Sequence, residues 1–521
     1  MSKYIIYLVL LIIILIIIYL LLWHYNTTME YFKNYKTYIA VIIVVCLLYI
    51  LYNNESIEYY NQLGGANKRN RIKFMQFNIE NGGTLIDFSK VIKIIKSTDA
   101  DVVAIEEANG NMHKIAKESG YPYYDNRTQI MSHYPIINPG DAYGIYVLIE
   151  MEPNKVIAVS NVHLPSDPYG PEELHKGESY RKVTKLEKSL RLYALQRQIK
   201  TLPKLMNENI PIFLAGDFNS PSHLDCKETE EKCFIWPISL TLEKLGFKDS
   251  YREIYSDANE NHGYTWWADR PKVKDDWNPG PNDKHDRIDF IYIGGPVKPE
   301  RFQIIGEKDI SPWPSDHRAI VLDCSVKLAR SPIYVAVNHR MIEVGNKIKI
   351  KYYTSKNNYG NIIAIRNNNS NQNVKEIMLT NKLYGEIEIS LELKEGNYNI
   401  VLLNNKNKSL SETPLIIKPK NAKVELKTNK KIYNIGEPIT VYWEYGPGNR
   451  FDWIIIQKED APKTEDMHYW HSTQSEINGS HTFSKTTLDK DKWPLDPGIY
   501  DIKYMVDDSY EIIASIKIHI Q

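Results

Sequence analysis

The sequence Ile212-Phe213-Leu214-Ala215-Gly216-Asp217-Phe218-Asn219 joins a short apolar run directly to an acid and an amide. The run 212–215 is typical of a buried strand, so Asp217 and Asn219 should stand at its end. A second string, Ser315-Asp316-His317, places a carboxylate and an imidazole beside another strand-like run. Such groups together could hold a divalent cation, orient a water molecule and bind a phosphate oxygen. The default prediction is a metal-dependent phosphoesterase.

The region 71–328 alternates short apolar runs with amphipathic stretches, which predicts a mixed α and β domain. Helices are expected at 88–95 and 186–205. The second helix carries four basic residues, Lys188, Arg191, Arg197 and Lys200. Such a stretch is usually a solvated helix face, although it could also contact a polyanion. Strands are expected at 72–77, 102–105, 146–149, 156–162, 212–215, 288–293 and 319–322.

Polar residues gather at the ends of these predicted strands. Asn78 and Glu80 are two residues apart after the first strand, so an extended chain would place them on one face. Glu107 follows the second strand, and Asn161 and His163 repeat the spacing of two at the end of the fourth. We therefore expect these side chains to converge on one rim of a sheet.

The residue types at this rim suit hydrolysis with a metal ion. Glu80, Glu107 and Asp316 offer carboxylates to Mg²⁺, which prefers oxygen ligands and keeps several waters. Asp217 could take a proton from water while the amide of Asn219 holds that water or a phosphate oxygen. Each of these acids alone would more often be an ordinary surface residue, so the hypothesis depends on the whole set.

Six short strings strongly resemble, in the same order, the endonuclease/exonuclease/phosphatase superfamily of deoxyribonuclease I-like hydrolases. The resemblance implies an α+β fold in which two mixed β-sheets pack face to face with helices outside, a four-layer α/β/β/α sandwich with the site at one rim. The matching strings are Phe77-Asn78-Ile79-Glu80, Ala104-Ile105-Glu106-Glu107, Asn161-Val162-His163-Leu164, Gly216-Asp217-Phe218-Asn219, Arg287-Ile288-Asp289-Phe290 and Ser315-Asp316-His317.

The resemblance also implies a ligand set for Mg²⁺, with Mn²⁺ as the alternative ion. Glu107 matches the principal metal carboxylate of the family, Asn78 stands beside it, and Asp316 completes the cluster. Glu80 matches an aspartate ligand of the AP-endonuclease branch, so its longer side chain makes this ligand less secure than the others.

The remaining strings imply catalytic roles. Asp217 and Asn219 would orient or deprotonate the attacking water, and His317 would face the scissile phosphate and stabilise the charge of the transition state. The acid that orients this last histidine in the family should be Asp289, two residues after Arg287. Asp286 is near enough in the sequence to compete for that role.

A further group of residues is expected to contact the substrate or to act beside it. His163 falls where deoxyribonuclease I and sphingomyelinases have histidine and AP endonucleases have tyrosine, which argues against an abasic-site enzyme; a lone histidine at a strand end is, however, more often without a function. Asn161 shares its string. Thr265 and Trp266 lie in a segment that resembles the Thr-aromatic stretch near the substrate of the family, with core and rim packing as the equal alternative.

The first 53 residues predict a transmembrane hairpin. The segment 4–23 is an almost unbroken apolar run long enough to span the hydrocarbon core, and 37–52 is a shorter run edged by tyrosines. An uncleaved single-pass signal anchor and, for the second run, a buried core helix are the alternatives. The polar residues 54–70 then form a linker. We expect a membrane protein, multi-pass or single-pass.

The signals for membrane sidedness and for a polyanionic partner conflict. Basic residues near the hairpin slightly favour a cytosolic catalytic domain, whereas the pair Cys226 and Cys233 would suit an oxidising compartment. The chain has 64 basic and 64 acidic residues, so its net charge gives no general attraction to nucleic acid. Any basic footprint would have to be local.

The last third of the chain contains a repeat instead of catalytic residues. The segment 344–350 is echoed by 435–441, and 395–400 is echoed by 497–502. Alternating strands and turn signals at this period predict two all-β immunoglobulin-like sandwiches. Their boundaries are expected at 331–420 and 421–521. They would act as spacers or bind a protein, membrane or substrate partner.

The whole pattern predicts a membrane-anchored, Mg²⁺-dependent phosphoesterase that uses an activated water. A nuclease is the first choice by resemblance, and a phospholipid or sphingomyelin phosphodiesterase is close behind because membrane attachment would present the site to lipid headgroups. An inositol-phosphate phosphatase is third. The competing class is a non-enzymatic adhesion or scaffold protein with a relic hydrolase domain, against which the intact strings argue.

Overall fold

The structure is a computed structural model, and its unit Arg69–Gln521 is the compact part that we analyse. The described residues are 70–142, 144–226, 233–269, 285–354, 361–379, 382–390, 392–461, 469–485, 493–507 and 509–521. Within these ranges, none of the helices has both the length and the apolar character needed to cross a bilayer. The predicted hairpin at 1–53 and the linker at 54–70 lie outside the described residues except for Asn70, so the hairpin remains a prediction.

The first sheet of the mixed α and β domain predicted at 71–328 has six strands in the order β11-β12-β1-β2-β4-β3. β1 (Asn70–Asn78) is parallel to β2 (Val102–Glu106) and antiparallel to β12 (Ala319–Val326). Because β1 and β2 run in the same direction, the polar residues at their ends meet at one edge. The other strands are β11 (Val297–Ile305), β4 (Ile130–Ser132) and β3 (Tyr123–Asp125).

The second sheet has seven strands, six of them in the order β5-β6-β7-β8-β10-β9 with β13 paired to β7. β7 (Lys155–His163) and β8 (Ile212–Asp217) are parallel, and β10 (Asp289–Gly294) is antiparallel to β8. The remaining strands are β5 (Ile136–Ile137), β6 (Val147–Glu152), β9 (Lys248–Asp249) and β13 (Ala329–Arg330). All seven strands predicted from the sequence are present.

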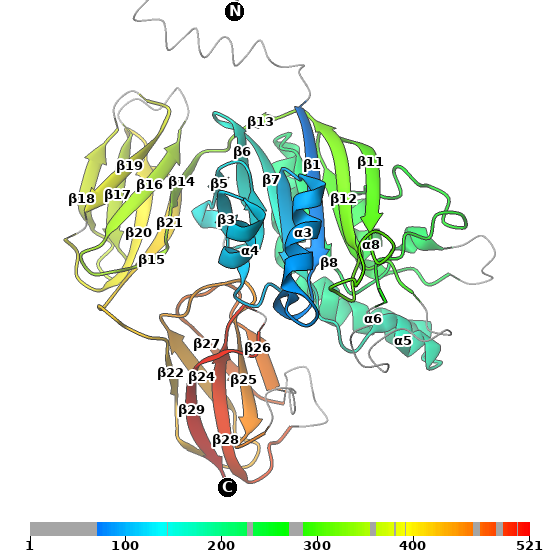
Figure 1. The fold of residues 1–521 in the computed structure, drawn as a ribbon. Coiled ribbons are helices and arrows are strands. Elements are labelled where there is room, and N and C mark those ends of the chain that lie inside the picture. The colour runs from blue at the N-terminus through cyan, green and yellow to red at the C-terminus, as the bar shows by residue number, and fades with distance from the viewer. Residues whose placement is uncertain are drawn as a thin grey trace, which may run out of the picture. The chain divides into compact units, whose positions relative to one another are not determined.

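The two sheets pack face to face, and helices cover their outer faces (Figure 1). Phe74 of β1 stacks on Phe213 of β8 across the interface, with ring centroids 5.0 Å apart. α3 (Phe88–Thr98) and α4 (Met112–Ser119) bury their apolar sides against the first sheet. α7 (Gln196–Asn207) and α8 (Pro237–Lys244) do the same on the second. The domain is therefore a four-layer α/β/β/α arrangement.

The long helix predicted at 186–205 is interrupted. The chain forms α6 (Tyr180–Glu187), the π-helical turn η4 (Lys188–Leu192) and then α7. Arg191 lies in this turn, fully buried, with its guanidinium 2.7 Å from the Glu187 carboxylate and also bonded to the carbonyls of Ser166 and Pro168. Arg191 is thus unavailable to a polyanion, which corrects the prediction of one continuous basic face.

Short helices also form in the loops of this domain. The segment 164–179, between β7 and α6, contains α5 (Gly170–His175). Three 3-10 turns complete the domain: η2 (Asn81–Gly83), η3 (Gly140–Ala142) and η5 (His223–Asp225). Cys226, directly after η5, is bonded to Cys233 in a disulfide, and Cys324 is free and buried.

The C-terminal region forms two all-β parts with the same strand arrangement, a three-stranded sheet facing a five-stranded one (Figure 1). We call them the first and the second sandwich. The strands of the first are β14 (Tyr334–Val337), β15 (Met341–Glu343), β16 (Lys347–Tyr353), β17 (Ile362–Asn367), β18 (Asn373–Met378), β19 (Tyr384–Ser390), β20 (Gly396–Leu403) and β21 (Ser409–Lys418). Those of the second are β22 (Glu425–Thr428), β23 (Ile432–Tyr433), β24 (Ile439–Glu444), β25 (Trp453–Lys458), β26 (Tyr469–Ser472), β27 (Gly479–Phe483), β28 (Gly498–Met505) and β29 (Ile512–Ile520).

The repeat seen in the sequence is also a repeat of the topology. β15 runs parallel to β21 in the first sandwich, and β23 runs parallel to β29 in the second. Each sandwich has its own apolar core, which includes Ile350 in the first and Val441 in the second. These two residues belong to the echoed segments, so the sequence repeat marks equivalent core positions.

Replacing Glu187 by alanine should strongly destabilise the α/β/β/α domain. The substitution leaves the buried guanidinium of Arg191 without its carboxylate, and breaking a buried ion pair from one side costs about 3–5 kcal/mol. Urea unfolding followed by tryptophan fluorescence measures the change. Glu172→Ala, which removes an exposed partner of Lys176, is the matched control and should leave the midpoint unchanged. Equal midpoints for both variants would contradict the structural role of the buried pair.

Candidate active site

The pairing of three neighbouring strands brings three of the predicted residues together. His163 at the end of β7 is paired with Asp217 at the end of β8, because these strands are parallel. Asp289 at the start of β10 is also paired with Asp217, because β10 runs in the opposite direction. Asp217 is therefore flanked on both sides by predicted catalytic residues, and the strand register alone fixes this placement.

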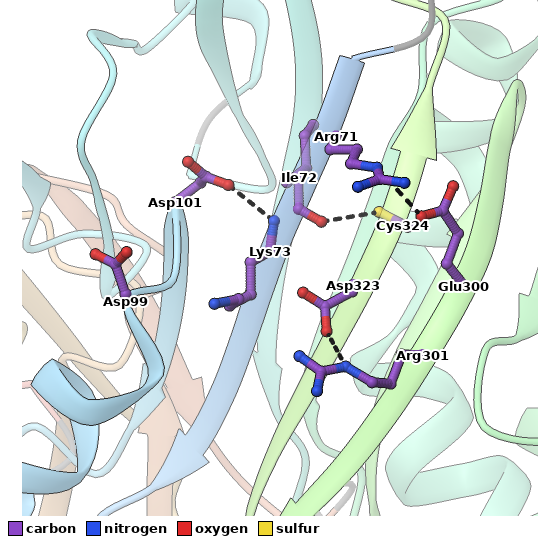
Figure 2. Close-up of a pocket in the computed structure, with 9 residues that line it drawn as sticks. All are labelled: Arg71, Ile72, Lys73, Asp99, Asp101, Glu300, Arg301, Asp323 and Cys324. Carbon is purple, nitrogen blue, oxygen red and sulfur yellow. Dashed lines mark hydrogen bonds and ion pairs between the residues drawn. The ribbon is translucent and has the colours of Figure 1, made fainter.

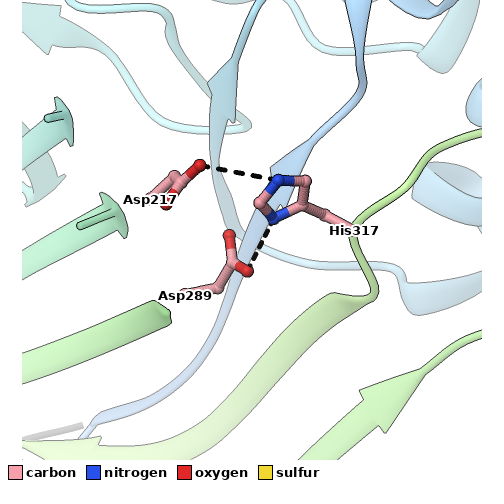
Figure 3. A group of neighbouring side chains, drawn as sticks. All are labelled: Asp217, Asp289 and His317. Atoms are coloured by element: carbon pink, nitrogen blue, oxygen red, sulfur yellow. Dashed lines mark hydrogen bonds and ion pairs between the residues drawn. The ribbon is translucent and has the colours of Figure 1, made fainter. Parts of the chain in front are cut away.

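His317 and Asp289 form a buried pair beside Asp217 (Figure 3). The Nδ1 N–H of His317 donates to Asp289 Oδ2 over 2.8 Å. The other carboxylate oxygen of Asp289 accepts a 2.8 Å hydrogen bond from Gln76. Asp286, the competing candidate, instead accepts a hydrogen bond from the Tyr169 hydroxyl, so it is Asp289 that orients His317.

The electrostatic surroundings of His317 favour its protonated form. Burial by itself lowers the pKa of the imidazole, but the carboxylates of Asp289, Asp316 and Asp217 outweigh burial and raise it well above the usual value. With Nδ1 bonded to Asp289, the Nε2 N–H is directed toward Asp217 Oδ2, 3.6 Å away. An imidazolium in this position can donate to an oxygen placed between the two groups.

Asp217 is a buried carboxylate with a raised pKa. Burial raises the pKa of Asp217 to about 6, and the positive charge of His317 only partly opposes this shift. Asp217 Oδ1 accepts from the Asn219 backbone N–H (2.8 Å), and Oδ2 accepts from the Asn78 amide (3.2 Å). His163 Nε2 lies 3.7 Å from the same Oδ2. A carboxylate of this pKa can accept a proton from water near neutral pH.

Asn219 is held firmly in place beside Asp217. Its side-chain amide donates to the Leu164 carbonyl (3.0 Å) and lies 3.3 Å from Asp217 Oδ2. Its backbone adopts a left-handed conformation with φ 48°, which asparagine tolerates better than most residues. The turn after β8 therefore presents the Asp217 and Asn219 side chains together.

The four predicted metal ligands are connected by a chain of hydrogen bonds. Asn78 Nδ2 donates to Glu107 Oε1 (3.1 Å), and Asn78 Oδ1 accepts from the backbone N–H of Glu80 (3.1 Å). Glu80 Oε2 in turn accepts from the backbone N–H of Asp316 (3.2 Å). Asn78 also bonds to Asp217, so it joins the predicted metal ligands to the catalytic residues.

Two of these acids stand on strained backbone. Glu80 has φ 54° and Glu107 has φ 57°, in the left-handed region that costs energy for a side chain of this kind. The Glu107 loop is held by the backbone N–H of Gly82, which donates to the Glu107 carbonyl, and by that of Asn81, which donates to Glu107 Oε2, both over 2.8 Å. Such strain is typical of functional sites, where the surrounding structure stabilises one arrangement.

The predicted substrate-binding residues differ in how far their side chains are buried. Thr265 is buried, and its hydroxyl accepts from the backbone N–H groups of Ile288 and Asp289, both over 3.1 Å, so it fixes the start of β10. Trp266 is partly exposed, and its indole N–H donates to Asp316 Oδ2 (3.3 Å). Asn161 is buried, and its amide donates to the Ile105 carbonyl (2.7 Å).

The structure adds three residues that sequence reasoning missed. Gln76, fully buried, donates to both Glu106 Oε2 (2.6 Å) and Asp289 Oδ1 (2.8 Å). Glu106 is itself fully buried; burial and the nearby Asp289 raise its pKa well above the usual value. Ser315 donates to the Asn78 carbonyl and accepts from the His317 N–H. The available signal was the spacing of two that joins Gln76 to Asn78 along one face of β1.

The residues present fit an oxygen-coordinated cation. Glu107 and Asp316 are only partly buried, and Asp316 Oδ1 is a buried oxygen without a hydrogen-bond partner among the described residues. Asp217, Asp289 and His317 form a second candidate group, with their ligand atoms within 4.8 Å of one another. In that group the Nδ1 of His317 already bonds to Asp289 over 2.8 Å, so only its Nε2 faces Asp217.

The structure also has a depression of about 470 Å³ at the opposite end of β1 (Figure 2). Its charged groups pair with one another, Arg71 with Glu300 at 3.6 Å and Arg301 with Asp323 at 2.7 Å. Arg71 is seven residues before Asn78 along the same strand. This depression is therefore separate from the candidate site and holds none of the predicted functional residues.

In comparisons with known proteins, residues 75–317 match the Endonuclease/Exonuclease/phosphatase family. The chain is also 29% identical over 297 residues to an uncharacterized protein of Caenorhabditis elegans, F14F9.5, which covers 49% of this chain and 91% of that protein. The family match confirms the resemblance predicted from the six strings, and it spans all six of them completely, from Phe77 to His317.

The chain is also similar to solved structures, among them two proteins of low sequence identity. TDP2 from C. elegans is 20% identical, covers 53% of this chain and 83% of its own, and has a TM-score of 0.32. An endonuclease/exonuclease/phosphatase family protein from Leptotrichia buccalis is 14% identical, covers 49% and 99%, and has a TM-score of 0.31.

The pKa of His317 should fall when its carboxylate partner is neutralised. In metal-free protein we expect His317 to remain protonated well above the usual imidazole pKa, and Asp289→Asn should lower that pKa because it removes the closest of the carboxylates that raise it. A histidine NMR titration in a chelating buffer measures both values. Asp286→Asn is the control, since Asp286 bonds to Tyr169. An equal shift in the two variants would contradict the assignment of Asp289 as the orienting acid.

Proposed function

Starting from an endonuclease/exonuclease/phosphatase domain over residues 75–317, we propose that the protein is a metal-dependent phosphoesterase that hydrolyses phosphodiester bonds with an activated water. The observation that carries this proposal is the buried His317–Asp289 pair, whose free N–H is directed toward the Asp217 carboxylate at 3.6 Å. A proton donor and a proton acceptor face each other there, with Asn219 beside them.

The catalytic roles follow from this geometry. Asp217, with its pKa raised to about 6, accepts the proton of the attacking water, and Asn219 orients that water. The protonated His317 donates to a nonbridging oxygen of the phosphate, where negative charge builds up in the transition state. Asp289 keeps the imidazole in place, and His163 stands where it can bind a second oxygen of the phosphate group.

Mg²⁺, or Mn²⁺ as the alternative, would bind to Glu107, Asn78, Asp316 and Glu80. The carboxylates and the unpartnered Asp316 Oδ1 supply the hard oxygen ligands that this ion prefers. When bound, the ion would neutralise charge on the phosphate group and polarise its oxygen. Asn78 links this ligand set to Asp217 and so keeps the two halves of the site in register.

Nucleic acid is the proposed substrate class. The family resemblance and His163 support it, whereas Arg191, buried against Glu187, no longer does. A phospholipid or sphingomyelin phosphodiesterase is the second candidate, favoured by the apolar runs at 4–23 and 37–52, which would anchor the protein in a membrane. An inositol-phosphate phosphatase is third. The intact hydrogen-bond network at the site argues against a non-enzymatic adhesion or scaffold protein with a relic domain.

Full-length protein with Mg²⁺ should hydrolyse one of four substrates: DNA, RNA, sphingomyelin or phosphoinositides. We expect His317→Ala to lower kcat by about 10²–10³-fold, because it removes a preorganised donor to the transition state. Glu107→Ala should act at least as strongly, and chelation by EDTA should abolish turnover. Product release measured on each substrate in parallel identifies the class.

The matched control for the histidine variant is His223→Ala. His223 bonds to Ser239 and Glu243, away from the site, so its removal should leave turnover unchanged. The enzyme assignment fails if none of the four substrates is turned over with Mg²⁺, or if full turnover survives both Glu107→Ala and His317→Ala. A product from sphingomyelin alone would replace the nuclease with the lipid phosphodiesterase.

A further inference from the structure

The second sandwich reaches the catalytic site through the loop 445–452 between β24 and β25. The backbone N–H of Arg450 donates to the Arg127 carbonyl of the hydrolase domain (3.0 Å). The next residue, Phe451, places its ring against the ring of His163 in an edge-on contact, with centroids 6.4 Å apart. His163 Nε2 lies 3.7 Å from Asp217 Oδ2. Phe451 therefore contacts the histidine that neighbours the carboxylate proposed to accept the proton of the attacking water.

A second contact joins the same sandwich to the loop that carries Glu107. The Asp507 carboxylate, almost fully buried, accepts from the backbone N–H of Gly110 (3.0 Å) and from the side-chain amide of Gln129 (2.7 Å). Gln129 in turn accepts from the backbone N–H of Ala108 through its side chain and from that of Ile105 through its carbonyl. Asp507 and Gln129 thus hold the loop on both sides of Glu107.

Asp452 ties these two contacts together inside the sandwich. Its carboxylate accepts from the backbone N–H of Asp507, from the Tyr504 hydroxyl and from the backbone N–H of Asn449, each over 3.0 Å. Asp452 directly follows Phe451 in the chain. The residue that contacts His163 and the residue that holds the Glu107 loop are therefore parts of one rigid unit.

The close approach at this boundary is built into the backbone. A Cβ atom on Gly144 of the hydrolase domain would lie 2.5 Å from Ser475 Oγ of the second sandwich. Gly144 also has φ 74°, a conformation that favours glycine. A side chain at this position would have to displace Ser475 and would be strained by the backbone conformation, so the two parts are in direct contact here.

We propose that the second sandwich forms one wall of the catalytic site, with Phe451 contacting a planar ring of the substrate next to the scissile phosphate and Asp507 positioning the Glu107 loop. This inference rests on the phosphoesterase function proposed above. The partly exposed Phe451 ring carries no charge and no hydrogen-bonding group, so it suits a nucleobase, which stacks on aromatic side chains. It offers nothing to an inositol ring covered with phosphates.

The contact of Phe451 with substrate can be tested with a pair of substrates. Full-length wild type, Phe451→Ala, Phe451→Leu and Phe451→Tyr are assayed with Mg²⁺ on a dinucleoside monophosphate and on its analogue lacking one base. We expect Phe451→Ala and Phe451→Leu to lower kcat/KM about tenfold on the complete dinucleotide, with little change on the analogue, and Phe451→Tyr to retain activity. Phe451→Leu keeps the apolar bulk, so it separates loss of the ring from loss of packing.

Tyr442→Ala is the control variant, since Tyr442 is an exposed aromatic residue of β24 in the same sandwich. The inference is overturned if wild type hydrolyses the dinucleotide and Phe451→Ala behaves like Tyr442→Ala on both substrates. The proposed nuclease function fails separately, and takes the nucleobase contact with it, if wild type hydrolyses neither substrate while the protein is folded.

The positioning role of Asp507 has a different readout. Asp507→Ala should weaken Mn²⁺ binding several-fold, as measured by calorimetry on the full-length protein without substrate, and should raise the metal concentration needed for half-maximal activity while KM stays unchanged. Asp507→Asn keeps one acceptor oxygen and should restore part of the affinity. The control is Asp496→Ala, an exposed acid of the same sandwich. Unchanged Mn²⁺ affinity in Asp507→Ala, with Glu107→Ala impaired, would overturn this role.

Discussion

The site depends on the exclusion of water from the Asp217, Asp289 and His317 cluster. Placed in solvent, these groups would be two ordinary acids and an ordinary base. Burial raises the pKa of Asp217, which makes this carboxylate a better proton acceptor. The neighbouring carboxylates outweigh the opposite effect of burial on the pKa of His317 and favour its protonated form, which can donate a hydrogen bond. The two face-to-face sheets that bury this cluster are therefore part of its chemistry as well as its support.

The strands and the main site were predictable from the sequence because both depend on local patterns. An apolar run followed by polar residues identifies a strand and its end, and the parallel pairing of β7 and β8 then brings His163 and Asp217 together. The same local reasoning was wrong in predicting one continuous helix over 186–205. The π-helical segment η4 interrupts it and places the Arg191 side chain in the interior, paired with Glu187. Charge alone could not show which basic residues would be buried.

Other features escaped prediction because they depend on contacts between distant segments. Gln76 looks like an ordinary polar residue of a strand, and its role follows only from its position between Glu106 and Asp289. Phe451 lies in a region where the sequence predicts no catalytic residues, and its contact with His163 joins positions that no short-range pattern connects. The metal ligands stay a prediction, supported by the chain of hydrogen bonds from Glu107 to Asp316.

The link between Asp507 and the Glu107 loop has a consequence for how the protein is made. All residues of the six matching strings have been synthesised once His317 is added to the chain, yet the segment that braces the Glu107 loop is translated almost two hundred residues later. A nascent or prematurely terminated chain would thus carry all the catalytic residues without the brace. Synthesis of β28 and of the residues after it up to Asp507 would supply the brace, so the Glu107 loop is held only after most of the second sandwich has been made.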